Sequence, residues 1–484
     1  MTQASRETAL RLSIFTILCA AIIAVFSGSS SILFGLNNGD ALVFQIVGDG
    51  WRDGLIPYRD LFDHKGPLLY LIQIIGNFIW PGKAGVFILE VLFAVATFEL
   101  IFRCGQILRC PSVLNYAGIA TAMILFAAYL EGGNCVEEWS LPFQLLPLYL
   151  VLKYLKGRIS SITVPALITG ICFGAVAMIR INNNCIICGL AVFLIIYWCI
   201  HKQYSQITKC IAWFFAGCLL SVAPFIIYFA ATGSLNEMVY ANFIFNMHYK
   251  ANWNAPMGLE QYARNTVRLL PCIILPIMSF LYCRKQSKSV FGLMTLISAV
   301  TFIVFLTGNG FSHYYLMVIP IAALCVQTSG FSPVTGYLAA AVIALPVIGY
   351  YISLPLQRID NIKKEQARYS SLTNDNFIQS IIPECELDSI YTFGTPEVGG
   401  TLILTGHYPI GKYFFMQMTF PKVDDFVKND IRNDFSTHNP LWVIASHDVP
   451  SKHVVPLDST NYREIPLDSL PDNFPENWHI YKRL

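Results

Sequence analysis

The chain has 484 residues, of which 55% are hydrophobic and 13% charged, and its mean hydropathy is +0.53. A water-soluble protein of this size cannot bury so much apolar surface, so the composition predicts an α-helical polytopic membrane protein. The formal net charge of +2 gives no electrostatic basis for binding nucleic acid.

The N-terminal segment places Arg6 and Arg11 before an apolar run, Leu12–Phe26, that continues to Phe34. A basic start and an apolar run are also typical of a cleavable signal peptide, here ending near residues 27–29. Because the run is long enough to span a bilayer, we predict a retained first helix with its N-terminus in the cytoplasm.

Charged residues are concentrated in the segment 37–70, directly after this first apolar run. They are Asp40, Asp49, Arg52, Asp53, Arg59, Asp60, Asp63, His64 and Lys65. Charged side chains are costly near a bilayer, at roughly 2.5–3.5 kcal/mol for Asp or Arg at a helix centre. The cluster therefore indicates a functional site rather than a merely solvated loop.

Further apolar segments are predicted to span the membrane, while the run 67–80 is short for a span. The spanning segments lie at about 85–103, 112–130, 139–155, 162–180, 185–201, 207–231, 264–283, 289–307, 312–328 and 332–354.

The distribution of basic residues decides how the run 67–80 is placed. If it does not cross, four successive loops on the cytoplasmic side carry the Lys and Arg residues, as the positive-inside rule requires. These are Arg103, Arg109, Lys153, Lys156, Arg158, Lys202, Lys209, Arg284, Lys285 and Lys288. We therefore predict about eleven transmembrane helices, an interfacial or re-entrant helix at 67–80, and a C-terminus outside.

The composition becomes polar after residue 356, which suggests a domain boundary. Residues 1–355 are predicted to form the membrane domain, with a first outer loop at 37–84, and residues 356–484 a small extracytoplasmic α/β domain. Within it we expect a charged helix at 358–368, strands at 389–393 and 441–445, and an amphipathic helix at 423–435. The chain lacks the GxxxxGK[ST] and GxGxxG motifs there, and His407, Asp424 and Asp425 are expected at the surface.

The 14 cysteines are scattered and lie mostly in apolar segments. Cys185 and Cys188 form a CxxC pair, but no second pair or histidine cluster completes a zinc site. Small buried hydrophobic residues are the better interpretation.

On the predicted topology, polar residues from several segments converge at the outer boundary of the membrane. They are Asp40, Glu137, Glu138, Arg180, His313 and the aromatic loop 240–253. Each has an alternative role: snorkelling for the arginine, an interfacial belt for the aromatics, and stabilisation of a helix start for the glutamates. Together they suit a reaction between a lipid-borne phosphate and a polar acceptor, since a carboxylate can take a proton and cations can stabilise the leaving phosphate.

Short motifs in the same order resemble the bacterial GT-C glycosyltransferases related to protein O-mannosyltransferases and to the lipid A aminoarabinose transferase. The motifs are Asp40, Gly54-x-x-Pro57-Tyr58-Arg59-Asp60, Lys65-Gly66-Pro67-Leu68, Glu137-Glu138-Trp-Ser-Leu-Pro and His313-Tyr314-Tyr315-Leu-x-x-x-Pro320. The chain departs from the family in having Asp40-Ala41 in place of Asp-Glu, which weakens the case for a metal role there. It also has Lys65-Gly66-Pro67 in place of Lys-Pro-Pro, which leaves the lysine intact.

The resemblance implies transfer of a sugar from a polyprenyl-phosphate donor to a lipid, glycan or protein acceptor, on the outer face of the bacterial cytoplasmic membrane. Asp40 is the expected general base of an inverting transfer. Candidates to bind the donor phosphate are Lys65, Arg180 and His313. Candidates to position the acceptor or a cation are Glu137, Glu138, Arg59 and Tyr58. The expected substrate loop carries His248, Tyr249 and Lys250. The sequence shows no clear metal-ligand set, so no obligatory cofactor is expected, while a divalent cation stays compatible with the acidic groups.

Two other functions stay open. A transporter or lipid flippase predicts inverted repeats and ionisable groups near the bilayer centre, whereas here no repeat is found and the charges lie at the outer boundary. A glycan polymerase or ligase would use a related donor but usually has its large loop late in the chain.

Overall fold

The computed structural model describes residues 3–33, 39–130, 132–253, 258–283, 287–329, 333–351, 378–446, 455, 457, 460–471, 474–475 and 477–484. The chain divides into two units, each assembled from three separate stretches. The first, here called the helical unit, comprises Met1–Ser27, Phe87–Phe225 and Met257–Arg358. The second, the mixed unit, comprises Gly28–Val86, Ile226–Pro256 and Ile359–Leu484.

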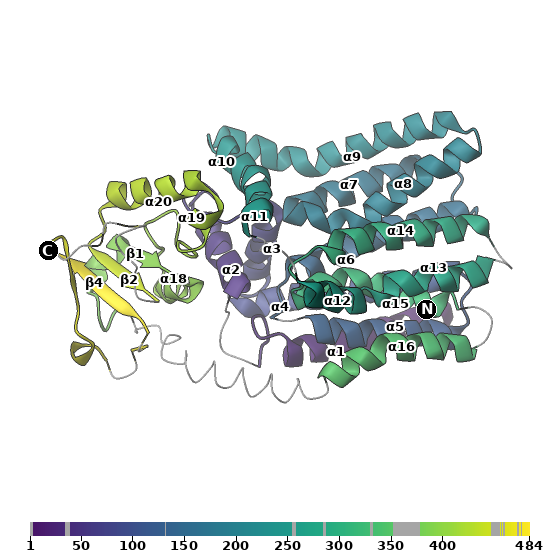
Figure 1. Ribbon diagram of the computed structural model, residues 1–484, viewed down its shortest axis with the longest axis horizontal. Coiled ribbons are helices and arrows are strands. Elements are labelled where there is room, and N and C mark those ends of the chain that lie inside the picture. Colours follow the sequence, from purple (N-terminus) through teal and green to yellow (C-terminus); the bar gives the residue numbers. More distant parts are fainter. Residues whose placement is uncertain are drawn as a thin grey trace. The chain divides into compact units, whose positions relative to one another are not determined.

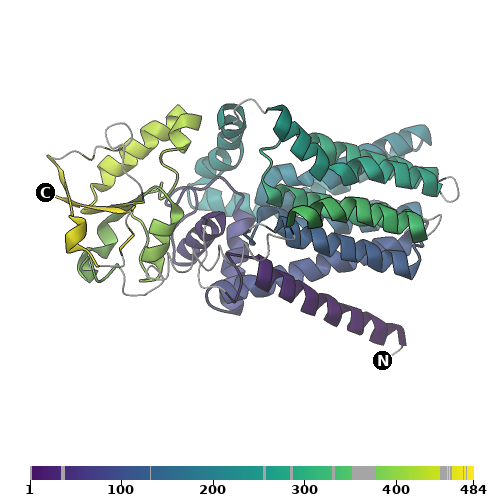
Figure 2. The same ribbon diagram turned by 60° about the horizontal axis from the view of Figure 1, so that its bottom comes forward.

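The helical unit is a bundle whose long helices run side by side, as Figures 1 and 2 show for α4 to α8 and α13 to α16. Its elements are α1 (Gln3–Phe26), α4 (Lys83–Ile107), α5 (Ser112–Tyr129), α6 (Val136–Leu155), α7 (Thr163–Arg180), η1 (Ile181–Asn184), α8 (Cys185–Ile200), α9 (Tyr204–Ala231), α12 (Leu259–Arg268), α13 (Leu270–Cys283), α14 (Lys288–Leu306), η3 (Ser312–Val318), α15 (Ile319–Gln327) and α16 (Pro333–Tyr351).

Six stretches of helix among the described residues are long and apolar enough to cross a membrane. They are Ser5–Phe26, Lys83–Ile107, Ser112–Tyr129, Thr163–Ile200, Tyr204–Ala231 and Lys288–Leu306. The chain is therefore a multi-pass helical membrane protein. Several shorter apolar helices accompany them, including Pro67–Ile79, and the count of eleven spans stays a prediction.

Buried amides join three helices in the core of this bundle. The Asn115 Nδ2 donates to the carbonyl of Phe102 at 3.1 Å. The Gln327 Nε2 donates to Asn115 Oδ1 at 2.8 Å and to the carbonyl of Ile101 at 3.2 Å. These bonds link α4, α5 and α15, and they satisfy the Asn115 amide and the Gln327 side-chain nitrogen, which would be costly to leave unpaired in an apolar interior.

The mixed unit combines short helices with a four-stranded sheet. Its elements are α2 (Gly39–Arg52), α3 (Pro67–Ile79), α10 (Leu235–Val239), η2 (Tyr240–Ile244), α11 (Phe245–Trp253), η4 (Glu384–Ser389), β1 (Ile390–Phe393), α18 (Pro396–Ile403), α19 (Phe420–Val423), α20 (Asp425–His438), β2 (Trp442–Ala445), β3 (Tyr462–Glu464), η5 (Leu467–Ser469) and β4 (His479–Arg483). The strand order is β1-β2-β4-β3. Strands β1 and β2 are parallel, and the other two pairs are antiparallel.

The predicted strands at 389–393 and 441–445 are confirmed as β1 and β2, and the predicted helix at 423–435 as α20. Strands β3 and β4 were not predicted, because β3 is short and β4, with the sequence HIYKR, carries two basic residues. The charged helix expected at 358–368, and the loop residues Arg284 and Lys285, lie outside the described residues.

Two predicted boundaries in the membrane region are wrong. The apolar run that predicts the first helix continues to Phe34, but α1 ends at Phe26. Asp40 lies in the first turn of a separate helix, α2. The segment 264–283, predicted as one span, is divided at Leu269 into α12 and α13. Pro271 follows this break. A proline has no backbone N–H to donate to the carbonyl four residues earlier, here that of Val267, so it is tolerated in the first turn of α13 but not inside one continuous helix.

Candidate functional site

Asp40 and Lys65 lie close together in the mixed unit. The Asp40 carboxyl is in the first turn of α2, where the helix dipole favours a negative charge. Its side chain is 68% exposed, and its Oδ2 lies 3.9 Å from Lys65 Nζ. The pair therefore offers a solvent-accessible carboxylate beside a cation.

Lys65 itself is largely withdrawn from water, with its side chain 12% exposed. Its Nζ lies 3.2 Å from His64 Nε2 and 4.0 Å from Asp63 Oδ1. Because an ammonium group can only donate, His64 Nε2 accepts, and the ring proton is assigned to Nδ1, which is 3.3 Å from Asp63. The ammonium group is thus held mainly by the side chains of His64 and Asp63 and has little contact with solvent.

Asp63 is a member of this network that the sequence analysis did not single out. Its side chain is 1% exposed, and its oxygens accept from the Tyr70 hydroxyl at 2.9 Å and from the backbone N–H of His64 at 2.7 Å. In the sequence it is one of several Asp residues in the segment 37–70. What distinguishes it is its near-complete burial next to Lys65, which the sequence does not reveal.

Tyr58 supports Lys65 through the backbone. The Tyr58 side chain is fully buried, and its hydroxyl donates to the Lys65 carbonyl oxygen at 2.8 Å. Its φ of 70° lies in the left-handed region, which is unfavourable for a bulky residue and is maintained here by the surrounding contacts. In this position Tyr58 acts on the lysine rather than facing solvent.

Arg59 is already paired. Its Nε and NH2 groups donate to the two oxygens of Asp60, each at 2.8 Å. Burial opposes ionisation of Asp60, but the hydrogen bonds from Arg59 and from the backbone N–H of Ile56 outweigh it and hold the pKa of Asp60 below its usual value. Arg59 is half-exposed, so its outer edge stays accessible.

The predicted substrate loop forms η2 and α11, and it contacts the segment around His64. The Tyr249 ring stacks on the His64 ring with centroids 5.3 Å apart. His248 Nδ1 lies 2.6 Å from Asp424 Oδ2, while Lys250 is exposed. Asp424 is therefore buried, contrary to its expected place at the surface.

A second polar cluster lies in the helical unit around Arg180. Its guanidinium donates to Glu137 Oε1 at 2.7 Å and to the Tyr314 hydroxyl at 3.1 Å, and it lies 4.5 Å from the centroid of the Tyr314 ring. Glu137 is fully buried, whereas the Arg180 side chain is 26% exposed. The arginine thus has a buried counter-ion and stays partly exposed.

The remaining predicted residues of this unit surround the same cluster. His313 packs edge-to-face on Tyr314, with centroids 4.7 Å apart. Glu138 is buried and interacts electrostatically with Glu90 and Glu137. Within the described ranges, no group of three or more His, Cys, Asp or Glu side chains has the geometry to hold a metal ion.

The structure thus places most of the predicted site residues in two groups, apart from Arg59, which pairs with Asp60, and the exposed Lys250. Asp40, Tyr58, Lys65 and the loop residues His248 and Tyr249 belong to the mixed unit. The other cluster, in the helical unit, contains Glu137, Glu138, Arg180 and His313.

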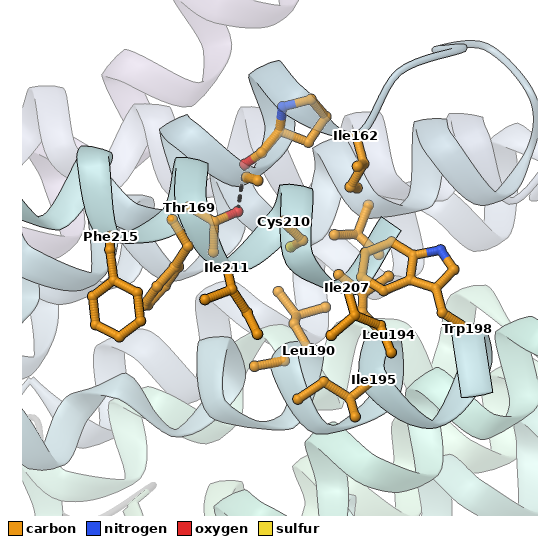
Figure 3. Close-up of a pocket in the computed structure, with 15 residues that line it drawn as sticks. Ile162, Thr169, Leu190, Leu194, Ile195, Trp198, Ile207, Cys210, Ile211 and Phe215 are labelled. Carbon is orange, nitrogen blue, oxygen red and sulfur yellow. Dashed lines mark hydrogen bonds between the residues drawn. The ribbon is translucent and has the colours of Figure 1, made fainter. Parts of the chain in front are cut away.

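An apolar cavity of about 220 Å³ lies elsewhere in the helical unit, among α7, α8 and α9 (Figure 3). Among the described residues that line it, none is charged. The Thr169 hydroxyl donates to the Pro165 carbonyl at 2.7 Å and so is already satisfied. This cavity has no group that could take a proton or hold a phosphate.

The fold is similar to that of membrane glycosyltransferases of known structure. The crystal structure of ArnT from Cupriavidus metallidurans, bound to undecaprenyl phosphate, is 12% identical, covers 92% of this chain and 93% of its own, and has a TM-score of 0.59. The chain has a GT-C fold.

The fold is also similar to that of an archaeal enzyme. The Archaeoglobus fulgidus oligosaccharyltransferase in complex with zinc and sulfate is 14% identical over 90% of this chain and 68% of its own, with a TM-score of 0.52. Its complex with an inhibitory peptide and a dolichol-phosphate has a TM-score of 0.50, with 13% identity over 92% of this chain and 70% of its own. No protein-family model matches the sequence, and a search of curated proteins found no match.

Proposed function

We propose that this chain is an integral-membrane glycosyltransferase that moves a sugar from a polyprenyl-phosphate donor to a lipid, glycan or protein acceptor on the outer face of the cytoplasmic membrane. The fold supports this proposal over nearly the whole chain. Two of the similar structures hold an isoprenoid phosphate, undecaprenyl phosphate in one and dolichol-phosphate in the other.

The observation that carries the proposal is the Asp40–Lys65 pair, with its carboxylate exposed and its ammonium group 3.9 Å away and largely withdrawn from water. In the proposed reaction, Asp40 removes the proton of an acceptor hydroxyl, whose oxygen attacks the anomeric carbon of the donor sugar. The bond from that carbon to the phosphate oxygen breaks, the configuration inverts, and polyprenyl phosphate leaves. Lys65 stabilises the negative charge of the departing phosphate.

The other predicted roles are proposed on the same basis. Arg180 and His313 are proposed as additional ligands of the donor phosphate. Glu137 and Glu138 are proposed to position the acceptor or a cation. In the mixed unit, Arg59, which is half-exposed, is proposed to contact the acceptor. Tyr58 was expected on the acceptor side too, but it is fully buried and donates to the Lys65 carbonyl, so we propose that it orients Lys65 instead.

The test is a transfer assay with purified protein and a panel of polyprenyl-phosphate sugars, which scores the release of polyprenyl phosphate. Asp40→Asn should reduce release by about 10²–10⁴-fold, the usual contribution of a general base. Asp468→Asn is the matched control, because Asp468 is an exposed carboxylate on η5 of the same unit. Thermal unfolding of both variants checks that each is folded.

The possible results of this assay distinguish a glycosyltransferase from a transporter and test the role of Asp40. Release that depends on Asp40 supports an inverting lipid-linked sugar transferase. Wild-type rates in a folded Asp40→Asn protein would remove Asp40 from the mechanism. No release from the wild type, together with movement of lipid or solute in proteoliposomes, would replace the glycosyltransferase with a transporter.

A further inference from the structure

Asp424 is a buried carboxylate whose two oxygens are both engaged. It is the N-cap residue of α20, and its Oδ1 accepts from the backbone N–H of Phe426 at 2.9 Å. Its Oδ2 accepts from the Tyr240 hydroxyl at 2.6 Å and from His248 Nδ1, also at 2.6 Å. Since a carboxylate only accepts, Nδ1 of His248 carries the ring proton. Asp424 thus links α20 to a segment that precedes it by more than 170 residues.

A π-helical turn, η2, brings the two donors to the same carboxylate. It spans Tyr240–Ile244 at the start of the segment that contains both Tyr240 and His248. In a regular α-helix, side chains eight residues apart point about 80° away from each other. One additional residue absorbed by a π turn reduces this divergence to about 20°. Turns of this kind are frequently found at functional sites.

The following helix, α11, contacts the segment that contains Lys65. Asn246 Nδ2 donates to the His64 carbonyl oxygen at 2.8 Å, and the Tyr249 ring stacks on the His64 ring at an interplanar angle of 23°. The Phe245 ring packs edge-to-face on Phe62, with centroids 5.4 Å apart. The backbone and the ring of His64 are therefore both held by α11.

His64 in turn contacts Lys65, because its Nε2 accepts from Nζ at 3.2 Å. A continuous series of polar and ring contacts thus runs from Asp424, through His248 and α11, to His64 and Lys65. All of these residues lie in the mixed unit.

We propose that Asp424 is a positioning residue for the proposed donor-binding lysine: it fixes the orientation of α11, which holds His64 and thereby Lys65. The inference rests on the proposed function only in assigning Lys65 to the donor phosphate. It gives the C-terminal part of the chain a role in donor binding, without contact between Asp424 and the reacting atoms.

Three variants test this role. Asp424→Ser keeps an efficient N-cap for α20 but is too short to reach Tyr240 or His248. Tyr240→Phe removes only one of the two donors. Asp425→Asn is the matched control, because Asp425 is the next residue, is exposed, and lies in the first turn of the same helix.

Two measurements are made on each folded variant. Hydrogen–deuterium exchange of residues 245–250 and 62–66 reports local order without reference to activity. Steady-state transfer separates KM for the donor from kcat. Asp424→Ser should raise exchange in both segments and raise the donor KM by about tenfold or more, since charge-assisted hydrogen bonds are lost. The kcat of Asp424→Ser should change less than its KM. Tyr240→Phe should raise exchange and the donor KM by less than Asp424→Ser does. Asp425→Asn should behave as wild type.

Unchanged exchange in both segments of a folded Asp424→Ser protein would overturn the proposal. A fall in kcat at constant KM would also overturn it, because it would indicate only a smaller fraction of folded enzyme. If the wild type transfers no sugar, the proposed function fails. The exchange data still decide whether Asp424 orders α11 and the segment around His64.

Discussion

Two carboxylates of the mixed unit lie in similar sequence surroundings but differ in how far water reaches them. Asp40 is 68% exposed and Asp63 is 1% exposed, although both lie near Lys65. An exposed carboxylate can meet an acceptor hydroxyl, whereas a buried one that accepts from Tyr70 and a backbone N–H is better suited to orientation. This difference supports the proposal that Asp40 is the base and suits Asp63 to a supporting role.

Asp424 makes a pH-dependent contribution to stability. Burial opposes its ionisation, but the hydrogen bonds from Tyr240 and His248 outweigh burial and hold the pKa of Asp424 below its usual value. The folded protein therefore binds this proton less tightly than the unfolded chain does. The stabilisation is present above the ordinary aspartate pKa of about 3.9 and is lost as the pH falls through the lower, folded-state value.

This pH dependence can be measured by thermal unfolding of the wild type and of Asp424→Asn between pH 7 and pH 3. We expect the variant to have the lower Tm at pH 7 and the difference to shrink at the acidic end. Asp425→Asn serves as the control at each pH. A Tm difference that stays constant over the whole range would contradict the assignment.

Pairs of helices are joined by polar contacts as well as by apolar packing. The Arg11 guanidinium on α1 donates to both oxygens of Glu99 on α4, each at 2.9 Å. Arg103 donates to the same carboxylate at 2.7 Å, and the Arg11 guanidinium lies 4.2 Å from the centroid of the Phe102 ring. The side chains of Arg11 and Glu99 are 10% and 11% exposed.

Glu99→Gln should therefore destabilise the attachment of α1. It leaves the buried Arg11 without its counter-charge, and breaking such a pair typically costs about 3–5 kcal/mol. Glu260→Gln is the matched control, since Glu260 pairs with Arg264 at 3.8 Å on the exposed side of α12, where the effect should be below about 1 kcal/mol. Unfolding in denaturant gives both values. Equal losses of unfolding free energy in the two variants would show that the buried Arg11–Glu99 pair stabilises the protein no more than an exposed pair does.

At the scale of the whole molecule, the mixed unit is not a contiguous domain appended to the membrane helices. Helix α18 packs on α2 so closely that a Cβ atom added at Gly400 would lie 2.8 Å from a methyl carbon of Leu42. The backbone N–H of Gly39 donates to Glu397 at 3.3 Å, and that of Phe62 donates to the Lys412 carbonyl at 2.8 Å. The C-terminal residues thus cover the helix that carries Asp40.

Truncation of residues 378–484 should consequently disturb α2 as well as remove the sheet. Ile46 and Leu42 would lose apolar neighbours, so hydrogen exchange in residues 39–52 should become faster. Exchange in α14, which belongs to the helical unit, is the internal control and should change little. Unaltered protection of 39–52 in the truncated protein would show that α2 is ordered without the C-terminal part.

The sequence alone determined the class of the protein and many of its elements. Hydrophobicity and its periodicity are local properties, so the long apolar helices, the short helix at Pro67–Ile79 and the strands β1 and β2 were predictable. The motif order also led to a GT-C fold, which the structural comparison confirms. The cost of charges between apolar segments pointed to the cluster at 37–70. The family resemblance then selected Asp40 and Lys65 within it, and their catalytic roles stay predictions.

Tertiary structure alone decided which polar groups are buried and which groups they contact. Asp63 and Asp424 resemble other acidic residues of the chain, and only folding shows that one accepts from Tyr70 and the other from His248. The latter pair is separated by 176 residues, and no local pattern encodes a contact of that kind. A hydrogen bond depends on the positions of two specific atoms, whereas a helix depends on the average character of neighbouring residues.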